Sequence, residues 1–348
     1  MMENKNIVLF KNLIKPNELK EVFPLSQTIE QHVIACRQEV EDIINKKSSK
    51  KLVIVGPCSI HNVSEALEYG KKLKQVSDKV KDKFFIVMRV YFEKPRTTVG
   101  WKGLINDPDL NNTFDVNKGL RLARKLLIDL NNIGLPCGCE ILDTITPQYI
   151  SDLISWGAIG ARTTESQVHR QLVSGLSMPI GFKNGTDGDI GIAADAIVSA
   201  KYPHCFMGIS DDGIPSICQT NGNETCHIIL RGGKQGPNYF KEDIVKTEDV
   251  LKSKELNPSI IVDCSHGNSN KDFRNQPGVL EYLSKKVMSE VDYSNTVIGF
   301  MLESNLVEGK QKLDFNDPGE LKYGISITDS CLSIEETEAI LLKAYNTI

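Results

Sequence analysis

The chain has 348 residues, of which 40% are hydrophobic and 25% are charged, and its formal net charge is −4. This composition is typical of a globular enzyme and excludes a nucleic-acid partner held by a broad basic surface. The sequence contains no apolar stretch as long as a membrane helix, and its nine cysteines lack the short spacing of a disulfide framework. We therefore expect a cytoplasmic protein without a membrane partner.

An extension of mixed polarity, residues 1–48, comes first. Apolar residues within it recur at helical spacing and predict a helix over residues 29–46. The extension is surplus to the domain that follows, residues 49–348. We expect it to be an arm for regulation or oligomerisation that packs on a neighbouring subunit or on the flank of that domain.

Eight short apolar runs follow, and each ends in, or leads straight into, a polar or chargeable residue. Runs of this length, rich in Val and Ile and separated by helical stretches, are typical of parallel strands buried on both faces. They are residues 52–55, 84–88, 138–139, 158–161, 179–182, 227–230, 260–262 and 297–302. Eight such strands predict an α/β fold, the (β/α)8 TIM barrel, whose active site lies at the carboxyl ends of the strands.

The segments between the runs carry helix and turn signals. An apolar stripe at helical spacing from Val116 to Leu130 predicts a helix. Thr146 and Pro147 predict the start of another helix, which would end at Gly157. After the fifth run, residues 205–222 interrupt the alternation and predict an inserted β-hairpin that turns at residues 211–213.

Cationic side chains gather at the predicted rim of the barrel. Four close the second, fourth, fifth and sixth strands, and two lie just beyond the second: Arg89, Arg162, Lys183 and Arg231, then Lys94 and Arg96. Each could form a rim salt bridge, but together they would repel one another unless anions fill the mouth. Because Arg matches phosphate and carboxylate in bidentate geometry, we expect small phosphorylated substrates. The glycine turns at 183–185 and 231–233 would let backbone N–H groups approach a phosphate.

Potential metal ligands follow the first, seventh and eighth strands. They are a thiolate, an imidazole and two carboxylates, from Cys58, His266, Glu303 and Asp329. A closed barrel would bring them to one side of its mouth. The mixed set suits one divalent ion such as Mn, Fe, Co or Zn, and a single thiolate favours a catalytic over a structural site. Glu140 ends the third strand beside the cations and could orient them, hold a water or form a salt bridge.

Seven unbroken runs resemble one enzyme family. They are GPCSIH at 56–61, MRVYFEKPRTT at 88–98, GARTTES at 160–166, GFKNGTDG at 181–188, LRGG at 230–233, DCSH at 263–266 and SITD at 326–329. These runs resemble class I 3-deoxy-D-arabino-heptulosonate 7-phosphate (DAHP) synthases, in a match that extends from about residue 10 to the C-terminus. The resemblance implies condensation of phosphoenolpyruvate with erythrose 4-phosphate, the entry step of the shikimate pathway of aromatic amino-acid biosynthesis.

The resemblance also implies roles for individual residues. The phosphate of phosphoenolpyruvate would contact Arg162, Lys183 and Arg231, and its carboxylate would contact Arg89 and Lys94. Ala161 is a further substrate-binding position. The phosphate of the aldose would contact Arg96 and Thr97. The positions that match the family's metal ligands are Cys58, His266, Glu303 and Asp329. The groups implied in catalysis are Lys94, Glu140, which also contacts substrate, and His266.

Regulation is implied in the same way. Similar feedback-inhibited members bind an aromatic amino acid between the N-terminal arm and the hairpin, and they are homodimers or homotetramers. The matching positions here are Pro147, Gln148, Leu172, Leu176, Ser177, Phe206 and Cys218. The arm at 13–20 and the run at 262–270 look closest to tyrosine-sensitive members. The resemblance therefore implies an aromatic inhibitor, with tyrosine favoured over phenylalanine.

Two other functions stay open on the residues alone. Lys183 closes the fifth strand and could form a Schiff base with a carbonyl substrate, as a lysine aldolase does. A barrel that binds phosphorylated metabolites without turnover would instead be a sensor. Borohydride trapping with substrate would identify the first, and an assay of phosphate release would separate the second from an enzyme.

Overall fold

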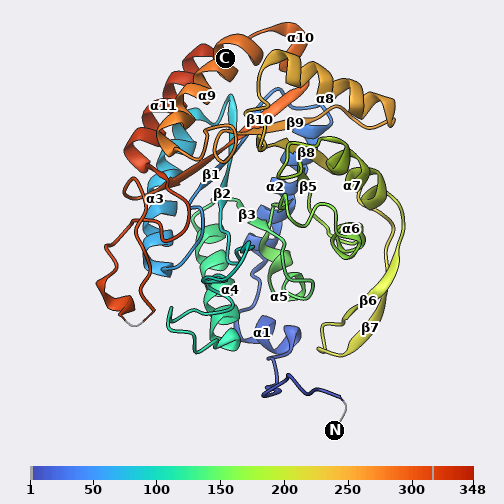
Figure 1. The fold of residues 1–348 in the computed structure, drawn as a ribbon, viewed down its shortest axis with the longest axis vertical. Helices are drawn as coiled ribbons and strands as arrows, with labels where there is room; N and C mark the ends of the chain where they lie inside the picture. Colours follow the sequence, from blue (N-terminus) through green and yellow to red (C-terminus); the bar gives the residue numbers. More distant parts are fainter. Residues whose placement is uncertain (1–2, 316) are drawn as a thin grey trace.

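A computed structural model describes residues 3–315 and 317–348 (Figure 1). The strands are β1 (Lys51–Gly56), β2 (Phe84–Arg89), β3 (Cys137–Glu140), β4 (Trp156–Ile159), β5 (Ile180–Lys183), β6 (Cys205–Ile209), β7 (Pro215–Gln219), β8 (His227–Leu230), β9 (Ile260–Asp263), β10 (Val297–Asn305) and β11 (Leu332–Ser333). The α-helices are α1 (Pro16–Val22), α2 (Gln27–Ile44), α3 (Val63–Val80), α4 (Val116–Asn132), α5 (Pro147–Ile150), α6 (Gln167–Val173), α7 (Gly191–Lys201), α8 (Lys241–Ser253), α9 (Gln276–Tyr282), α10 (Val291–Ser294) and α11 (Ile334–Thr347).

Eight parallel strands close into a barrel, as the apolar runs predict. The ring follows the order β1-β2-β3-β4-β5-β8-β9-β10, and β1 pairs with β10 to close it. β1, β8 and β9 are buried along their whole length, which is why their sequences are near-continuous runs of Val, Ile and Leu. β11 bonds to the end of β10 outside the ring. The prediction of a (β/α)8 barrel is confirmed.

The helices surround the barrel (Figure 1). In α4 the apolar stripe, including Leu120 and Leu127, is buried as its spacing predicts. The helix predicted to run from Thr146 to Gly157 is too long, because α5 is a single turn and Gly157 lies inside β4. A Cβ at that position would lie 2.4 Å from Ile180 Cδ1, so this glycine permits strand packing rather than ending a helix.

The inserted hairpin is present where the sequence predicts it. β6 and β7 pair antiparallel, with Phe206 opposite Cys218. Gly213 has a φ of 71° at the turn, in the left-handed region that glycine adopts without strain. In Figure 1 the hairpin extends away from the barrel toward α1. It carries the apolar pair Met207 and Ile217, which are exposed.

The beginning of the chain connects the hairpin to the barrel. The Asn17 N–H donates to Asp211 O at 2.9 Å, and Lys20 Nζ lies 2.8 Å from Asp211 Oδ1 at the hairpin tip. On the other side, the Tyr149 hydroxyl donates to Ile14 O at 2.7 Å. α1 therefore contacts both α5 and the hairpin tip of its own chain.

α2 seals the amino-terminal end of the barrel. Val40, Ile43 and Ile44 belong to one buried cluster with interior strand residues such as Leu52. The Ser259 hydroxyl donates to Ile44 O at 2.9 Å and fastens the end of the helix. In Figure 1 α2 lies behind the strands. Within the described residues no helix combines the length and apolar composition that crossing a bilayer requires.

Candidate active site

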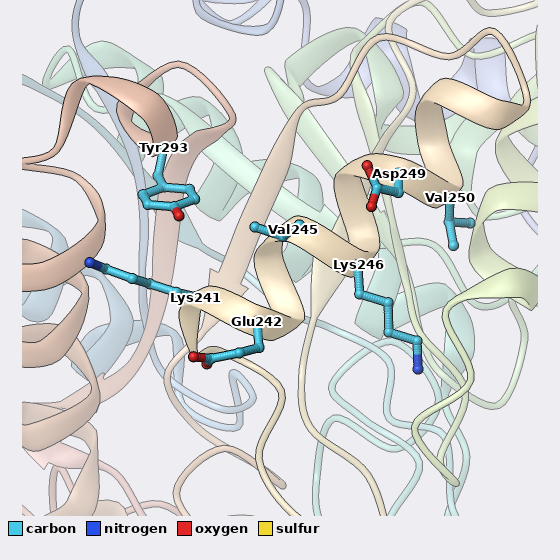
Figure 2. A pocket seen from close by; sticks show the side chains of 7 residues that line it. All are labelled: Lys241, Glu242, Val245, Lys246, Asp249, Val250 and Tyr293. Carbon is cyan, nitrogen blue, oxygen red and sulfur yellow. The ribbon is translucent and has the colours of Figure 1, made fainter.

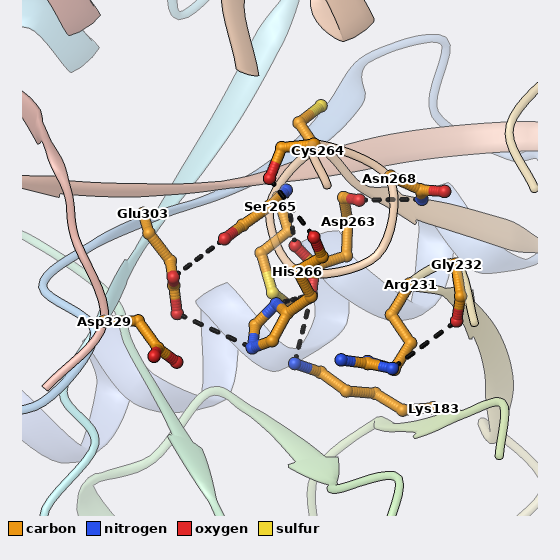
Figure 3. A network of polar contacts seen from close by, with 12 residues as sticks. Lys183, Arg231, Gly232, Asp263, Cys264, Ser265, His266, Asn268, Glu303 and Asp329 are labelled. Atoms are coloured by element: carbon orange, nitrogen blue, oxygen red, sulfur yellow. Dashed lines mark hydrogen bonds and ion pairs between the residues drawn. The ribbon is translucent and has the colours of Figure 1, made fainter. Parts of the chain in front are cut away.

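The carboxyl ends of the strands bring the predicted site residues to one mouth of the barrel. Cys58 follows β1, Arg89 ends β2 and Lys183 ends β5. Because parallel strands of a barrel end at the same rim, residues far apart in sequence become neighbours there. Figure 3 shows the side formed by the ends of β8, β9 and β10, where His266 and Glu303 point toward each other.

Cys58, Glu303 and Asp329 form a cluster of potential metal ligands. One ligand atom from each lies within 4.8 Å of the other two, and Cys58 Sγ is 3.8 Å from Asp329 Oδ2. Cys58 and Glu303 are fully buried, whereas Asp329 is exposed. His266, the fourth predicted ligand, lies at the edge of the cluster, with Nε2 3.9 Å from Glu303 Oε1. This donor set fits a divalent transition metal.

The protonation of these groups follows from their surroundings. Burial raises the pKa of the Cys58 thiol to about 11, and the nearby Glu303 charge adds to the shift. Burial also acts to raise the pKa of Glu303, but the charges of His266, Arg89 and Lys94 outweigh it and lower that pKa to about 2. Glu303 is therefore a carboxylate at physiological pH, whereas Cys58 would lose its proton when a metal binds.

Asp263, at the end of β9, holds two of the predicted site residues. Its Oδ2 lies 2.9 Å from His266 Nδ1 and 3.1 Å from Lys183 Nζ. Burial acts to raise the pKa of this carboxyl, but the charges of His266 and Lys183 lower it well below its usual range. Asp263 was not among the site residues predicted from the sequence. The available signal was a carboxylate at a strand end, the same position that drew attention to Glu140.

Arg89 and Lys94 contact residues of the ligand cluster. Arg89 is fully buried, with Nη2 3.1 Å from Glu303 Oε1 and its guanidinium carbon 4.0 Å from the centre of the Tyr91 ring. Lys94 Nζ lies 3.1 Å from Cys58 O and 3.3 Å from Cys58 Sγ. Both cations therefore offset the negative charge of the cluster, in addition to facing the mouth in which a substrate carboxylate is predicted.

Glu140 is buried at the end of β3, beside the turn that begins at Gly160. A Cβ at Gly160 would lie 2.3 Å from Glu140 Oε1, so the glycine leaves room for the carboxylate in its present position. The charge of Glu140 also reaches Lys94. Burial acts to lower the pKa of that ammonium, but Cys58 and Glu140 together raise it. Lys94 is therefore held in its protonated form.

Arg162 and Arg231 lie close enough for their charges to interact. Burial lowers the pKa of Arg231, and the Arg162 charge lowers it further, although Asp263 acts in the opposite direction. Ala161 and Arg162 lie in the turn that follows β4. Two guanidinium groups in mutual repulsion, with the Lys183 ammonium ending the neighbouring β5, favour an anion between them.

The glycine turn after β8 does not offer its backbone N–H groups to a phosphate, contrary to the prediction. The Arg231 N–H donates to Asn184 Oδ1 at 2.8 Å, and the Gly232 N–H donates to Asn238 Oδ1 at 2.7 Å. The glycine is needed for close packing instead, because a Cβ at Gly232 would lie 2.5 Å from the carbonyl carbon of Gly267. A phosphate at this turn would therefore rely on side chains.

Three buried asparagines brace these turns against one another. Asn238 Nδ2 donates to Asn184 Oδ1 at 3.2 Å, and the Asn238 N–H donates to Asn268 Oδ1 at 2.8 Å. Asn268 Nδ2 in turn donates to Asp263 O at 2.9 Å. This network was not predictable from the sequence, because an asparagine in a loop gives no signal until the fold supplies its partners.

Arg96 and Thr97 lie farther out, in the exposed connection between β2 and α4. Arg96 lines a cavity of about 410 Å³ together with Trp101 and Thr328, and Thr97 is not among the residues that line it. Trp101 is buried, and its Nε1 donates to Asp107 O at 2.8 Å. This bond joins two parts of the same connection and fixes its middle in a compact turn.

The predicted effector residues lie on α5, on and after α6, and on the hairpin. They are Pro147 and Gln148, then Leu172, Leu176 and Ser177, then Phe206 and Cys218. The Ser174 and Thr220 hydroxyl oxygens lie 2.6 Å apart and tie the end of α6 to the base of the hairpin. The structure therefore brings the second and third groups together, and it places α5 against the N-terminal arm.

A larger hollow, of about 560 Å³, lies along α8 (Figure 2). Its lining residues, which Figure 2 labels, are Lys241, Glu242, Val245, Lys246, Asp249, Val250 and Tyr293. None of them is a predicted site residue, and Lys241 is paired with Glu290 at 2.6 Å. The candidate active site is therefore the barrel mouth and not this hollow.

Residues 24–342 match the family model described as the DAHP synthetase I family. The chain belongs to this family. Among its DAHP synthetase I relatives, the Tyr-sensitive phospho-2-dehydro-3-deoxyheptonate aldolase of Escherichia coli (strain K12) is 49% identical over 347 residues, which covers 100% of this chain and 96% of that protein. The Phe-sensitive enzyme of the same strain is 49% identical over 338 residues, covering 97% and 95%.

A solved structure leads to the same family. The phospho-2-dehydro-3-deoxyheptonate aldolase from Francisella tularensis SCHU S4 is 50% identical to this chain and superposes with a TM-score of 0.94. The match covers 99% of this chain and 98% of that one. The similarity therefore includes the N-terminal arm and the hairpin as well as the barrel that DAHP synthetase I members share.

Proposed function

We propose that this chain is a DAHP synthase, which condenses phosphoenolpyruvate with erythrose 4-phosphate to form DAHP and phosphate. The observation that carries the proposal is the barrel mouth, where the cluster of Cys58, Glu303 and Asp329 lies beside buried cations, in a chain that belongs to the DAHP synthetase I family. The reaction would be the first step of aromatic amino-acid biosynthesis. Nine free cysteines agree with its expected place in a reducing cytoplasm.

The cations divide between the two substrates in this proposal. The phosphate of phosphoenolpyruvate is held by Arg162, Lys183 and Arg231, with Ala161 beside them, and its carboxylate by Arg89 and Lys94. Arg96 and Thr97 hold the phosphate of the aldose. Cationic side chains offset the repulsion between two polyanionic substrates and keep them in attack geometry. Because the asparagine network fixes the turn that carries Arg231, this part of the site is preorganised.

Cys58, His266, Glu303 and Asp329 would hold one divalent ion, Mn, Fe, Co or Zn. When bound, the ion supplies Lewis acidity to the aldehyde oxygen of the aldose. Asp263 orients His266 so that Nε2 faces the cluster. Lys94 is protonated and contacts the cluster, so it can donate a hydrogen bond to oxygen that gains negative charge. Glu140 is close enough for its charge to raise the pKa of Lys94, and it would orient that ammonium, together with a water, at the reacting carbon.

We also propose that an aromatic amino acid inhibits the enzyme, with tyrosine favoured over phenylalanine. The arm contacts α5 and the hairpin, which are the elements that carry the predicted effector residues. Two relatives carry tyrosine and phenylalanine sensitivity in their names. Val8, Leu9 and Phe10 are 101%, 76% and 76% exposed, and such an apolar run is typical of an interface, so we propose a homodimer or homotetramer.

The test is phosphate release from phosphoenolpyruvate plus erythrose 4-phosphate, with and without EDTA, Phe, Tyr and Trp. We expect turnover that EDTA abolishes and that added metal restores. Arg96→Ala should raise the KM for erythrose 4-phosphate, and Arg162→Ala should raise the KM for phosphoenolpyruvate. Each variant loses roughly 1.5–3 kcal/mol of binding free energy for every charged hydrogen bond that it removes. Two variants that weaken the same substrate would refute the assignment of pockets.

The lysine-aldolase alternative has less support. Lys183 Nζ is buried and already paired with Asp263 at 3.1 Å, so the nitrogen that a Schiff base would use is engaged by a carboxylate. Borohydride with phosphoenolpyruvate or erythrose 4-phosphate should therefore leave no covalent adduct on Lys183. A covalent adduct trapped on Lys183 would favour the lysine aldolase over the DAHP synthase.

A further inference from the structure

The connection after β10 builds one wall of the cavity that contains Arg96. The opposite wall comes from the connection after β2, with Arg96, Gly100 and Trp101. The wall after β10 consists of Lys310, Gln311, Lys312, Leu313, Phe315, Ile327 and Thr328. Two segments more than 200 residues apart in sequence therefore enclose about 410 Å³ at the barrel mouth.

The inner end of this cavity adjoins the candidate metal ligands. Thr328, which lines the cavity, immediately precedes Asp329. Its hydroxyl oxygen lies 2.7 Å from that of Ser59, the residue that follows Cys58. A molecule that extends from the ligand cluster into the cavity would therefore place one end near Cys58 and Asp329 and the other among the outer lining residues.

The outer lining is cationic. Arg96, Lys310 and Lys312 all line the cavity, and no acidic residue is among the lining residues. Within residues 3–315 and 317–348, no ion pair joins any of these three side chains to a carboxylate. Three cations without carboxylate partners favour a ligand with more than one negative charge, and a phosphate monoester is such a ligand.

The backbone that carries the two lysines is fixed from behind. Gln311, which lies between them, donates from Nε2 to Ile325 O at 2.9 Å and accepts the Lys322 N–H at Oε1 at 2.8 Å. Its own N–H donates to Ser326 O at 2.8 Å. Side chains two residues apart in an extended segment project to the same side, so anchoring Gln311 directs Lys310 and Lys312 together.

Arg96 is positioned from the facing wall. Gly100 has a φ of 149°, and a Cβ there would lie 2.7 Å from Arg96 Nε, so the guanidinium lies directly over the glycine backbone. The three cations thus belong to two short segments, each with its own fixed support. Arg96 was predictable from its position after the second strand, whereas two lysines in a loop carry no such signal.

We propose that Lys310 and Lys312 bind the terminal phosphate of the aldose substrate together with Arg96, and thereby set the affinity of the enzyme for that substrate. The inference rests on the proposed function, which places the aldehyde at the ligand cluster and the phosphate in this cavity. It adds two binding residues from the connection after β10 to those expected from the connection after β2. It also separates the aldose phosphate from the phosphate of phosphoenolpyruvate, whose predicted cations lie at the end of β5 and just after β4 and β8.

The experiment compares KM values for erythrose 4-phosphate and phosphoenolpyruvate in Lys310→Ala, Lys312→Ala and the double variant. The double variant should raise the KM for erythrose 4-phosphate about tenfold, because it removes two partly solvated charge pairs, while the KM for phosphoenolpyruvate stays within about twofold. Replacing both residues by Arg should restore most of the affinity. The control is Lys322→Ala, an exposed lysine of the same connection that does not line the cavity.

Salt dependence supplies a second readout. Added KCl should raise the KM for erythrose 4-phosphate in the wild-type enzyme more steeply than in the double variant, since screening acts on exposed charges. An unchanged KM for erythrose 4-phosphate in the double variant, or an equal rise for both substrates, would overturn the proposal. A wild-type enzyme that releases no phosphate would instead refute the proposed function. Calorimetric binding of erythrose 4-phosphate to wild-type and double-variant protein then still tests the lysines, because it needs no turnover.

Discussion

Nδ1 of His266 lies 2.9 Å from Oδ2 of Asp263. The contact holds the imidazole with Nε2 toward Glu303, although His266 lies in a loop and has a φ of 54°, in the left-handed region. A carboxylate behind a ligating histidine fixes the tautomer and orientation of the ring. Asp263 thus prepares His266 to bind a metal without itself belonging to the cluster of ligands.

Asp263→Asn should weaken the binding of Mn²⁺ by roughly 10–100-fold, the usual cost of losing a group that orients a ligand. The amide keeps the shape of the carboxylate but loses the charge that faces His266 and Lys183. Calorimetric titration of metal-free protein measures the effect. Asp272→Asn is the control, because Asp272 lies in the same loop and pairs with the exposed Arg274. Equal affinities in the two variants would show that Asp263 only stabilises the fold.

Cys58→Ala should abolish stoichiometric metal binding while the protein stays folded. The thiol lies on a turn after β1 and contacts Lys94 and Asp329, so its loss removes a ligand and leaves the barrel strands intact. Metal content after dialysis and the far-UV circular dichroism spectrum measure the two effects. Cys205→Ala, an exposed cysteine on the hairpin, should bind metal normally. A metal-replete Cys58→Ala protein would remove this residue from the site.

His227 should make the protein less stable in acid. Burial lowers its pKa to about 4 from an ordinary 6.5, and its Nε2 lies 3.1 Å from the Trp156 Nε1 that donates to it. Because the pKa of His227 is lower in the folded than in the unfolded protein, the neutral imidazole contributes to the free energy of unfolding. This contribution is complete above about pH 6.5 and is lost as pH falls toward 4. The shift corresponds to roughly 3 kcal/mol of unfolding free energy.

Urea unfolding between those two pH values measures the loss. The matched variant is His227→Gln, which keeps an acceptor for Trp156 but does not titrate. His61, whose pKa burial also lowers to about 4, is common to both proteins and cancels in the comparison. The wild-type protein should lose stability more steeply than the variant as pH falls. Parallel curves would mean that His227 does not titrate in this range.

Deleting residues 1–22 should remove inhibition by an aromatic amino acid and leave turnover in place. The deletion takes away α1, with its contacts to Asp211 at the hairpin tip, but keeps Phe23, whose carbonyl accepts the Arg124 side chain. An inhibitor acts only through a difference in affinity between two states, and that difference disappears with half of its pocket. Inhibition curves with Tyr, Phe and Trp measure the effect, and identical curves for both proteins would make the arm purely structural.

The barrel was predictable because its strands are buried on both faces. In β1 or β9 burial leaves little except Val, Ile and Leu, so the apolar runs mark the strand ends to within three residues. Residues such as Glu303 and Lys183 were predictable for a related reason. A charge at the end of an apolar run has to face the mouth of a barrel, whatever its partner is.

The parts that could not be predicted depend on contacts between loops. Gly232 looked like part of a phosphate-binding turn, but its N–H is taken by Asn238, a residue that nothing in the sequence connects to it. Gly157 looked like the end of a helix because glycine serves equally in caps and in crowded strands. Lys310 acquires its neighbours only when the connection after β10 lies opposite Arg96.

α2, which covers the amino-terminal end of the barrel, limits how far the chain can be shortened from its N-terminus. Val40, Ile43 and Ile44 each contribute roughly 1.5–3 kcal/mol by leaving water, against a net stability of about 5–15 kcal/mol for a whole domain. A fragment that begins at β1 would lack α2, and water would reach the apolar side chains at the amino-terminal end of the barrel. The smallest foldable unit therefore begins near Ser26, the N-cap of α2. Exchange of regulatory parts between relatives can replace α1 and the hairpin, but it has to leave α2 in place.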